Sequence, residues 1–126
     1  MNFPNNLKYT SDHEWIRVEG DTGWVGITDY AQSELGDVVY VELPSVGLKV
    51  EQGKSFGTIE AVKAVSDLFA PVSGEVLEAN KGVQTSPESV NKDPYGNGWM
   101  IKMRIANAGE LAKLHDVESY KKLVAK

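Results

Sequence analysis

The chain of 126 residues contains no cysteine. This absence excludes disulfide bonds, zinc sites with cysteine ligands, iron–sulfur clusters and thiol nucleophiles. Basic residues are also in the minority, because 13 Lys and Arg stand against 18 Asp and Glu and give a formal net charge of −5. A protein that binds nucleic acid generally needs a basic surface to replace counterions. We therefore expect no nucleic-acid partner.

The sequence has no apolar run long enough to span a bilayer. Its first residues, Met1–Asn6, show no charged segment followed by an apolar one and do not resemble a secretory signal. They also lack the Arg-rich amphipathic pattern of an organelle transit peptide. We therefore expect a cytoplasmic protein without a membrane partner.

The hydrophobic fraction of 41% is enough for a buried core. A chain of this length typically forms one domain, and we expect a single domain over residues 1–126. Short strand patterns separated by turn residues fill the first hundred positions. They predict a hairpin around the turn at 19–23 and further strands at 55–60, 65–69, 75–80 and 99–105.

One short helix interrupts the strands. Thr28 or Asp29 can cap a helix that runs through Leu35 and ends at Gly36. A helical tail is expected at about 108–125, and residues 83–98 have the Pro and Gly content of a surface loop. The predicted fold is mostly β, a sandwich or small barrel with an inserted helix and C-terminal helices.

The alternating apolar residues also predict the core. A strand after the helix has its inward face at Val39, Val41 and Leu43. The expected core side chains are Ile16, Val18, Val25, Ile27, Val39, Val41, Phe56, Ile59, Val76 and Ile101.

Few residues suggest catalysis. The two histidines, His13 and His115, are not in a cluster with metal-ligand spacing, so no metal site is expected and both are interpreted as structural. There is no phosphate-binding glycine loop and no nucleophile elbow. Glu14 and Asp67 can share acid–base work if the fold joins them, but a solvated surface explains them as well. By its residues alone, the chain does not look like an enzyme.

The most informative segment surrounds Lys63. One apolar strand leads up to this lysine and another leads away, and its neighbours Val62 and Ala64 are small or apolar. Such a turn leaves one long side chain accessible at its tip. This pattern, followed by Pro71 and Gly74, resembles the lipoyl and biotinyl carrier modules. Biotin carriers usually flank the lysine with methionines, so the neighbours here favour lipoate.

The resemblance extends over nearly the whole chain. The stretches at 9–15 (YTSDHEW), 26–32 (GITDYAQ), 35–44 (LGDVVYVELP) and 98–102 (GWMIK) are similar to those of the H-protein family of the glycine cleavage system. The resemblance implies a barrel-sandwich hybrid with a lipoyl hairpin around residues 55–76. It also implies a carrier without turnover of its own, bearing lipoate on Lys63.

The same resemblance implies the partners and a sheltering cleft. The partners are a pyridoxal-phosphate glycine decarboxylase, a tetrahydrofolate-dependent aminomethyltransferase, dihydrolipoyl dehydrogenase and a lipoate-attaching enzyme. A cleft for the aminomethyl-loaded arm is implied at Glu14, with Asp67 as a second wall. The alternatives are a lipoyl-relay protein, another lipoyl or biotinyl carrier, or an unmodified interaction domain on the same fold.

Overall fold

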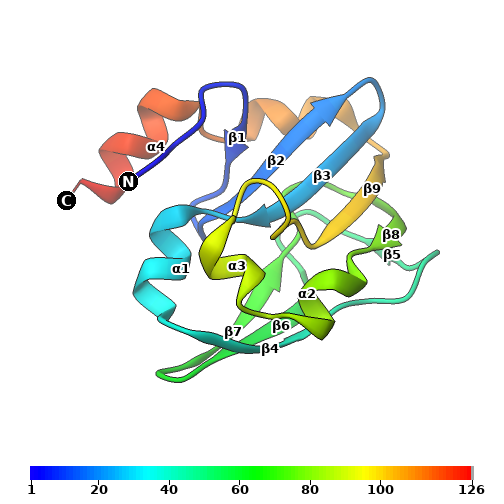
Figure 1. The fold of residues 1–126 in the computed structure, drawn as a ribbon. Coiled ribbons are helices and arrows are strands. Elements are labelled where there is room, and N and C mark those ends of the chain that lie inside the picture. The colour runs from blue at the N-terminus through cyan, green and yellow to red at the C-terminus, as the bar shows by residue number, and fades with distance from the viewer. Residues whose placement is uncertain (126) are drawn as a thin grey trace.

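The computed structural model describes residues 1–125 and contains two antiparallel sheets (Figure 1). The larger sheet has six strands in the order β1-β2-β3-β9-β8-β5, and the smaller has three in the order β4-β6-β7. The strands of the larger sheet are β1 (Lys8–Tyr9), β2 (Glu14–Glu19), β3 (Thr22–Ile27), β9 (Ile101–Ile105), β8 (Gly74–Ala79) and β5 (Lys49–Val50). Those of the smaller sheet are β4 (Val38–Glu42), β6 (Ser55–Ala61) and β7 (Val65–Phe69).

The core lies between the two sheets. Ile16, Val25 and Ile101 of the larger sheet belong to the same buried cluster as Val41 and Ile59 of the smaller one. Side chains alternate between the two faces along a regular strand, so one face of each sheet supplies the apolar layer. This sharing of one core holds β6 and β7 in a fixed position relative to the larger sheet.

The helix α1 (Asp29–Leu35) connects β3 of the larger sheet with β4 of the smaller one (Figure 1). The Oγ1 of Thr28 accepts a hydrogen bond from the N–H of Ala31 at 3.1 Å, which caps the first turn. Gly36 follows the last turn with φ +78° and ψ −157°, a positive-φ conformation that glycine adopts readily because it has no Cβ atom. The predicted capped helix is confirmed, with Thr28 as its cap.

The tail consists of a 3₁₀ helix η1 (Ala108–Lys113) and the helix α4 (Val117–Val124). Tyr120 of α4 stacks on Tyr9 of β1 with ring centroids 4.5 Å apart, and both belong to a second buried cluster with Leu7 and Trp15. Leu111 and Leu114 pack against the main core instead. The tail therefore closes one edge of the larger sheet and part of its core.

Two sequence predictions are wrong. Residues 83–98 are not a simple surface loop, since α2 (Lys81–Thr85) and α3 (Ser89–Lys92) occupy much of this region and bury Val83 and Val90. Val39 is not a core residue, because a bulge between Val38 and Tyr40 shifts the register of β4 against β6. Val38 and Val41 therefore point inward, and Val39 is 55% exposed.

Residues 1–125 contain no group of three or more His, Cys, Asp or Glu that could hold a metal ion. No helix within that range is long and apolar enough to cross a membrane.

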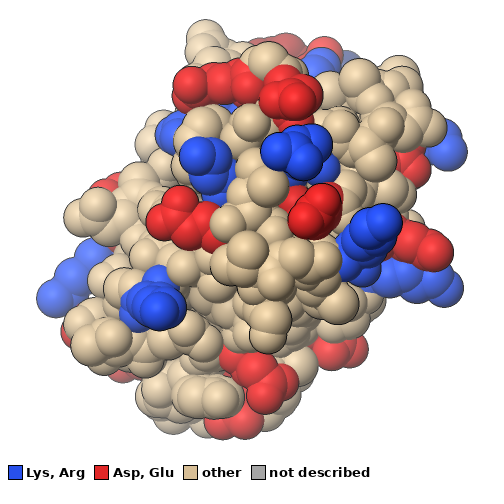
Figure 2. Space-filling model, turned by 90° about the vertical axis from the view of Figure 1, so that its right-hand side faces the viewer, with Lys and Arg blue, Asp and Glu red and all other residues tan. Residues whose placement is uncertain are grey.

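Figure 2 shows the side opposite α1, where acidic and basic side chains are interspersed.

Candidate functional site: an exposed lysine beside a buried carboxyl

Lys63 lies at the tip of the hairpin formed by β6 and β7, and its side chain is exposed. The N–H of Ala61 donates to the carbonyl of Ala64 at 2.8 Å and closes the turn. The N–H of Val62 donates to the carbonyl of Asp37 at 3.0 Å. The tip is thus tied to the segment that follows α1. The structure presents one amine on a supported turn.

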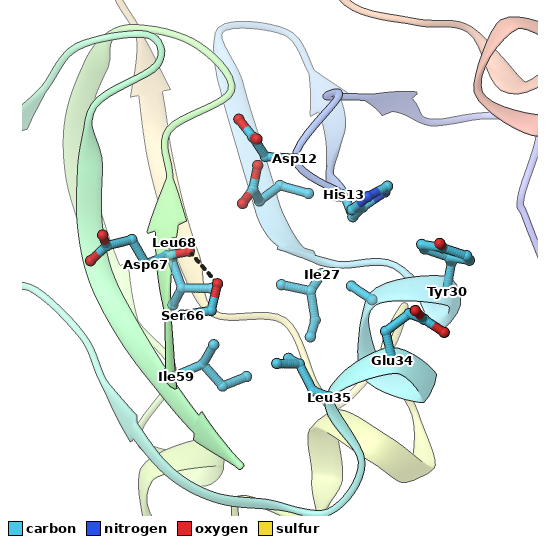
Figure 3. Close-up of a pocket in the computed structure, with 12 residues that line it drawn as sticks. Asp12, His13, Ile27, Tyr30, Glu34, Leu35, Ile59, Ser66, Asp67 and Leu68 are labelled. Atoms are coloured by element: carbon cyan, nitrogen blue, oxygen red, sulfur yellow. Dashed lines mark hydrogen bonds between the residues drawn. The ribbon is translucent and has the colours of Figure 1, made fainter. Parts of the chain in front are cut away.

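A cavity of about 250 Å³ opens between α1 and β7, next to this hairpin (Figure 3). Its apolar walls come from Ile27, Leu35, Ile59 and Leu68. Its polar lining includes Asp12, His13, Glu14, Tyr30, Glu34 and Ser66. The cavity therefore combines a hydrocarbon surface with a cluster of carboxyl groups.

Glu14 is the buried member of that cluster, only 2% exposed. The Thr10 hydroxyl donates to its Oε1 at 2.6 Å, and the N–H of Phe69 donates to its Oε2 at 3.2 Å. Burial raises the pKa of Glu14 to about 8, although these two hydrogen bonds oppose the shift. A cation that enters the cavity would favour the ionised carboxyl and so find a fixed acceptor.

The loop before Glu14 is held in an unusual conformation. His13 has φ +72°, which is uncommon for a residue other than glycine. Its Nδ1 lies 2.9 Å from the hydroxyl of Tyr120, and its ring packs against Tyr30 with centroids 4.8 Å apart. Burial lowers the pKa of His13, while Asp12 and Glu34 oppose the shift. The interpretation of His13 as structural fits these contacts, although its ring also lines the cavity.

Asp67 lies on the same hairpin but its carboxylate turns away from the cavity (Figure 3). The Ser55 hydroxyl donates to Asp67 Oδ1 at 3.4 Å. Because side chains alternate along a strand, it is Ser66 and Leu68 that face inward from β7. The structure thus brings Glu14 and Asp67 to the lining of one cavity, and the carboxylate of Asp67 turns away from it.

Several lining residues escaped the sequence reasoning. Tyr30 and Glu34 are four residues apart on α1, so they share one helix face. That spacing was visible in the sequence, but nothing indicated that this face would meet β7. Ser66 carried no signal of its own, because its inward position follows from the pairing of β6 with β7.

Comparison with known proteins decides the family. A model described as glycine cleavage H-protein matches residues 7–126. A glycine cleavage system H protein from Bacteroides thetaiotaomicron is 60% identical over 124 residues, which is 98% of each chain. The chain belongs to the glycine cleavage H-protein family. The resemblance inferred from the sequence is therefore confirmed.

Other relatives agree with this membership. A glycine cleavage system H protein from Carboxydothermus hydrogenoformans is 56% identical over 121 residues, covering 96% of this chain and 93% of the relative. The crystal structure of a glycine cleavage system H protein from Mycobacterium marinum matches with a TM-score of 0.90 at 39% identity, covering 98% of this chain and all of that one. The barrel-sandwich fold is thus confirmed. As an H protein, the chain is the lipoyl-bearing shuttle of the glycine cleavage system and not a catalytic enzyme.

Proposed function

We propose that Lys63 carries lipoate in an amide bond to its Nζ, and that the cavity between α1 and β7 receives the loaded end of this arm. In this proposal Glu14 meets the protonated amine of the carried aminomethyl group. The observation that supports it is the exposed lysine on a tied hairpin, beside a cavity that holds a buried carboxyl.

The residues present fit the proposed group. The apolar walls at Ile27, Leu35, Ile59 and Leu68 suit a hydrocarbon chain that ends in sulfur. When bound, lipoate supplies the two sulfurs that accept and release the cargo and that cycle between disulfide and dithiol. The absence of cysteine in this chain is compatible with that role, since the sulfur chemistry belongs to the cofactor.

Glu14 is placed to hold the amine. Thr10 and the N–H of Phe69 fix one hydrogen bond on each oxygen, and each oxygen keeps acceptor capacity. A hydrogen bond between an ammonium group and a carboxylate is roughly twice as strong as one between neutral groups. Asp67 contributes to a wall of the cavity in this arrangement, with its carboxylate turned away.

The proposed partners are those that the family implies. A glycine decarboxylase with pyridoxal phosphate loads the arm, and an aminomethyltransferase with tetrahydrofolate unloads it. Dihydrolipoyl dehydrogenase restores the disulfide, and a lipoate-attaching enzyme first modifies Lys63. A supported hairpin suits this series, because each enzyme then meets the arm in the same geometry. The net charge of −5 favours steering toward basic partner surfaces.

Whether the cavity protects the aminomethyl group is tested by measuring how fast the loaded protein loses this group spontaneously. Lipoylated wild type and Glu14→Gln are loaded with the aminomethyl group, and spontaneous release of ammonia and formaldehyde is followed without the transferase. We expect several-fold faster release from Glu14→Gln, because an amide cannot supply the opposite charge.

Asp67→Asn is the matched control. Its carboxylate turns toward Ser55, so we expect release at the wild-type rate. Equal release from Glu14→Gln and the wild type, at unchanged melting temperature, would remove Glu14 from the site. Faster release from Asp67→Asn alone would indicate that the amine of the cargo contacts Asp67 and not Glu14.

A further inference from the structure

The side chain of Lys63 lies against the C-terminal end of α1. A Cβ atom placed on Gly36 would come within 2.9 Å of Lys63 Cε and 3.8 Å of its Nζ. The methylene chain of the lysine thus passes over the position that a side chain at residue 36 would occupy. Three other glycines with positive φ, Gly20, Gly47 and Gly53, have nothing within 4 Å of such an atom.

The backbone at Gly36 is held from two sides. The Nδ2 of Asn91 donates to the carbonyl of Gly36 at 2.9 Å, and its Oδ1 accepts from the N–H of Val38 at 2.9 Å. Between them, the carbonyl of Asp37 accepts from the N–H of Val62 at the hairpin tip. The segment under the lysine is therefore fixed both to α3 and to the hairpin.

The same helix leads from this point to the cavity. Ala31, Glu34 and Leu35 of α1 line the cavity that Glu14 also lines, and Gly36 directly follows them. An arm that starts over Gly36 therefore starts at the end of the helix that forms one wall of its proposed binding cavity.

We propose that Gly36 is a positioning residue for the arm. Because Gly36 has no side chain, it leaves an open space, here called the saddle, and the side chain of Lys63 crosses this space on its way from the hairpin toward the cavity. This inference rests on the proposed function, since it requires Lys63 to carry the arm and the cavity to receive it. A free lysine side chain samples many rotamers, and ordering it costs up to about 2 kcal/mol of conformational entropy. A saddle that already selects the direction reduces the part of this cost that remains at docking.

A side chain at position 36 should redirect the arm without unfolding the protein. The atom it would strike is near the far end of an exposed, flexible lysine, so the lysine moves and the backbone stays. Gly36 has φ +78° and ψ −157°, a backbone region that only glycine occupies readily, so any alanine placed there adds a strain of roughly 1–3 kcal/mol. That strain must be separated from the effect on the arm.

Gly47→Ala and Gly53→Ala are control variants that separate the effect of backbone strain from the effect on the arm. Gly47 has φ +94° and Gly53 has φ +84°, so alanine is strained at both, yet neither position has an atom within 4 Å of the new methyl group. Gly36→Asn is a second test variant, because it places a larger side chain than alanine in the space that Lys63 crosses. Intact mass shows that each protein compared is fully lipoylated.

The measurement is the spontaneous release of ammonia and formaldehyde from each loaded protein. We expect Gly36→Ala and Gly36→Asn to release their cargo several-fold faster than the wild type, approaching Glu14→Gln, and both control variants to release it at the wild-type rate. Release from the Gly36 variants at the control rate, with Glu14→Gln still fast, would overturn the saddle and leave the proposed function standing. An unmodified Lys63, or a wild type no more protective than Glu14→Gln, would overturn the proposed function and the saddle with it.

Discussion

Glu14 has its carboxyl group buried between the loop at Thr10 and the main chain of Phe69. Burial favours the neutral form of this group, whereas the proposed amine of the cargo favours the ionised form. Folding and binding therefore select different protonation states of the same residue. This difference has a measurable effect on stability.

The free energy of unfolding should fall as pH rises through the pKa of Glu14. The pKa is about 8 in the folded state against an ordinary value of 4.5, so between these values the folded state holds a proton that the unfolded state has lost. Stability from the neutral group is fully present below pH 4.5 and is lost as pH rises through about 8. Glu14→Gln removes this loss, on the order of a few kcal/mol. We therefore expect the melting temperature of Glu14→Gln, relative to that of the unloaded wild type, to increase between pH 6 and pH 9.

Glu34→Gln is the matched control for this series. Glu34 lines the same cavity, but its side chain is exposed. The melting temperature of this variant should follow the wild type from pH 7 to pH 9, where His13, whose pKa is lowered from 6.5, stays neutral. A difference between Glu14→Gln and wild type that stays constant from pH 6 to pH 9 would contradict the assignment of the buried proton to Glu14.

The sequence indicated Glu14 and Asp67 as candidate site residues but could not show which of the two is buried. Glu14 and Asp67 are both acidic residues at strand positions, and the sequence allowed either to be solvated. The structure separates them, because the tight loop from Thr10 to His13 buries Glu14 while the alternation of β7 turns Asp67 outward. Burial of a charged group depends on tertiary packing, which no local pattern in this chain encodes.

The strand β4 shows how a bulge changes which side chains are buried. The alternation of Val39 and Val41 suggested one inward face, but Val38 pairs with Ala61 and Tyr40 with Glu60, so one residue is skipped. Val41 is fully buried and Val39 is more than half exposed. Two valines that would share one face of a regular strand therefore have opposite environments.

This contrast predicts unequal costs for the same substitution. Val41→Ala should lower the free energy of unfolding by about 2 kcal/mol, because two buried methyl groups are removed from the core. Val39→Ala should change it by roughly 0.5 kcal/mol or less, as for other surface substitutions. Urea denaturation of the two variants measures both values. Equal costs would contradict the register of β4 against β6.

Elements whose own residues mark their ends or their buried face were predicted correctly from the sequence. The cap at Thr28 and the exit at Gly36 predicted α1, and alternating residues around the turn at 19–23 predicted the hairpin of β2 and β3. The prediction of a surface loop at 83–98 was wrong because α2 and α3 are only five and four residues long, too short for a helical period to appear in the sequence. Proline and glycine in that region mark the turns between short helices.

The molecule as a whole places its core and its proposed cofactor site apart. The buried cluster lies between the sheets, whereas the end of the hairpin formed by β6 and β7 extends beyond it (Figure 1). Lys63 is an exposed residue in the turn between these two strands. The arrangement of the sheets was predictable as a class from strand spacing. Strand order and the position of α1 against β7 depend on contacts between distant segments, and only the resemblance to a family could suggest them from sequence.

The fold should therefore not depend on the modification. A change at the hairpin tip leaves the core untouched, so we expect unmodified and lipoylated proteins to melt within a few degrees of each other. Differential scanning calorimetry of the two forms at one pH measures this. A largely unfolded unmodified protein would show that the arm is part of the core.

Attachment of lipoate to Lys63 is tested most directly by peptide mass spectrometry of the protein isolated from its natural source. The peptide that contains Lys63 should carry a lipoyl-sized increment, and Lys63→Arg should fold normally, carry none and fail to support glycine decarboxylation in a reconstituted system. Lys54→Arg, directly before β6, should retain both the increment and the activity. An unmodified Lys63, an increment on another lysine, or normal activity of Lys63→Arg would contradict the role proposed for this residue.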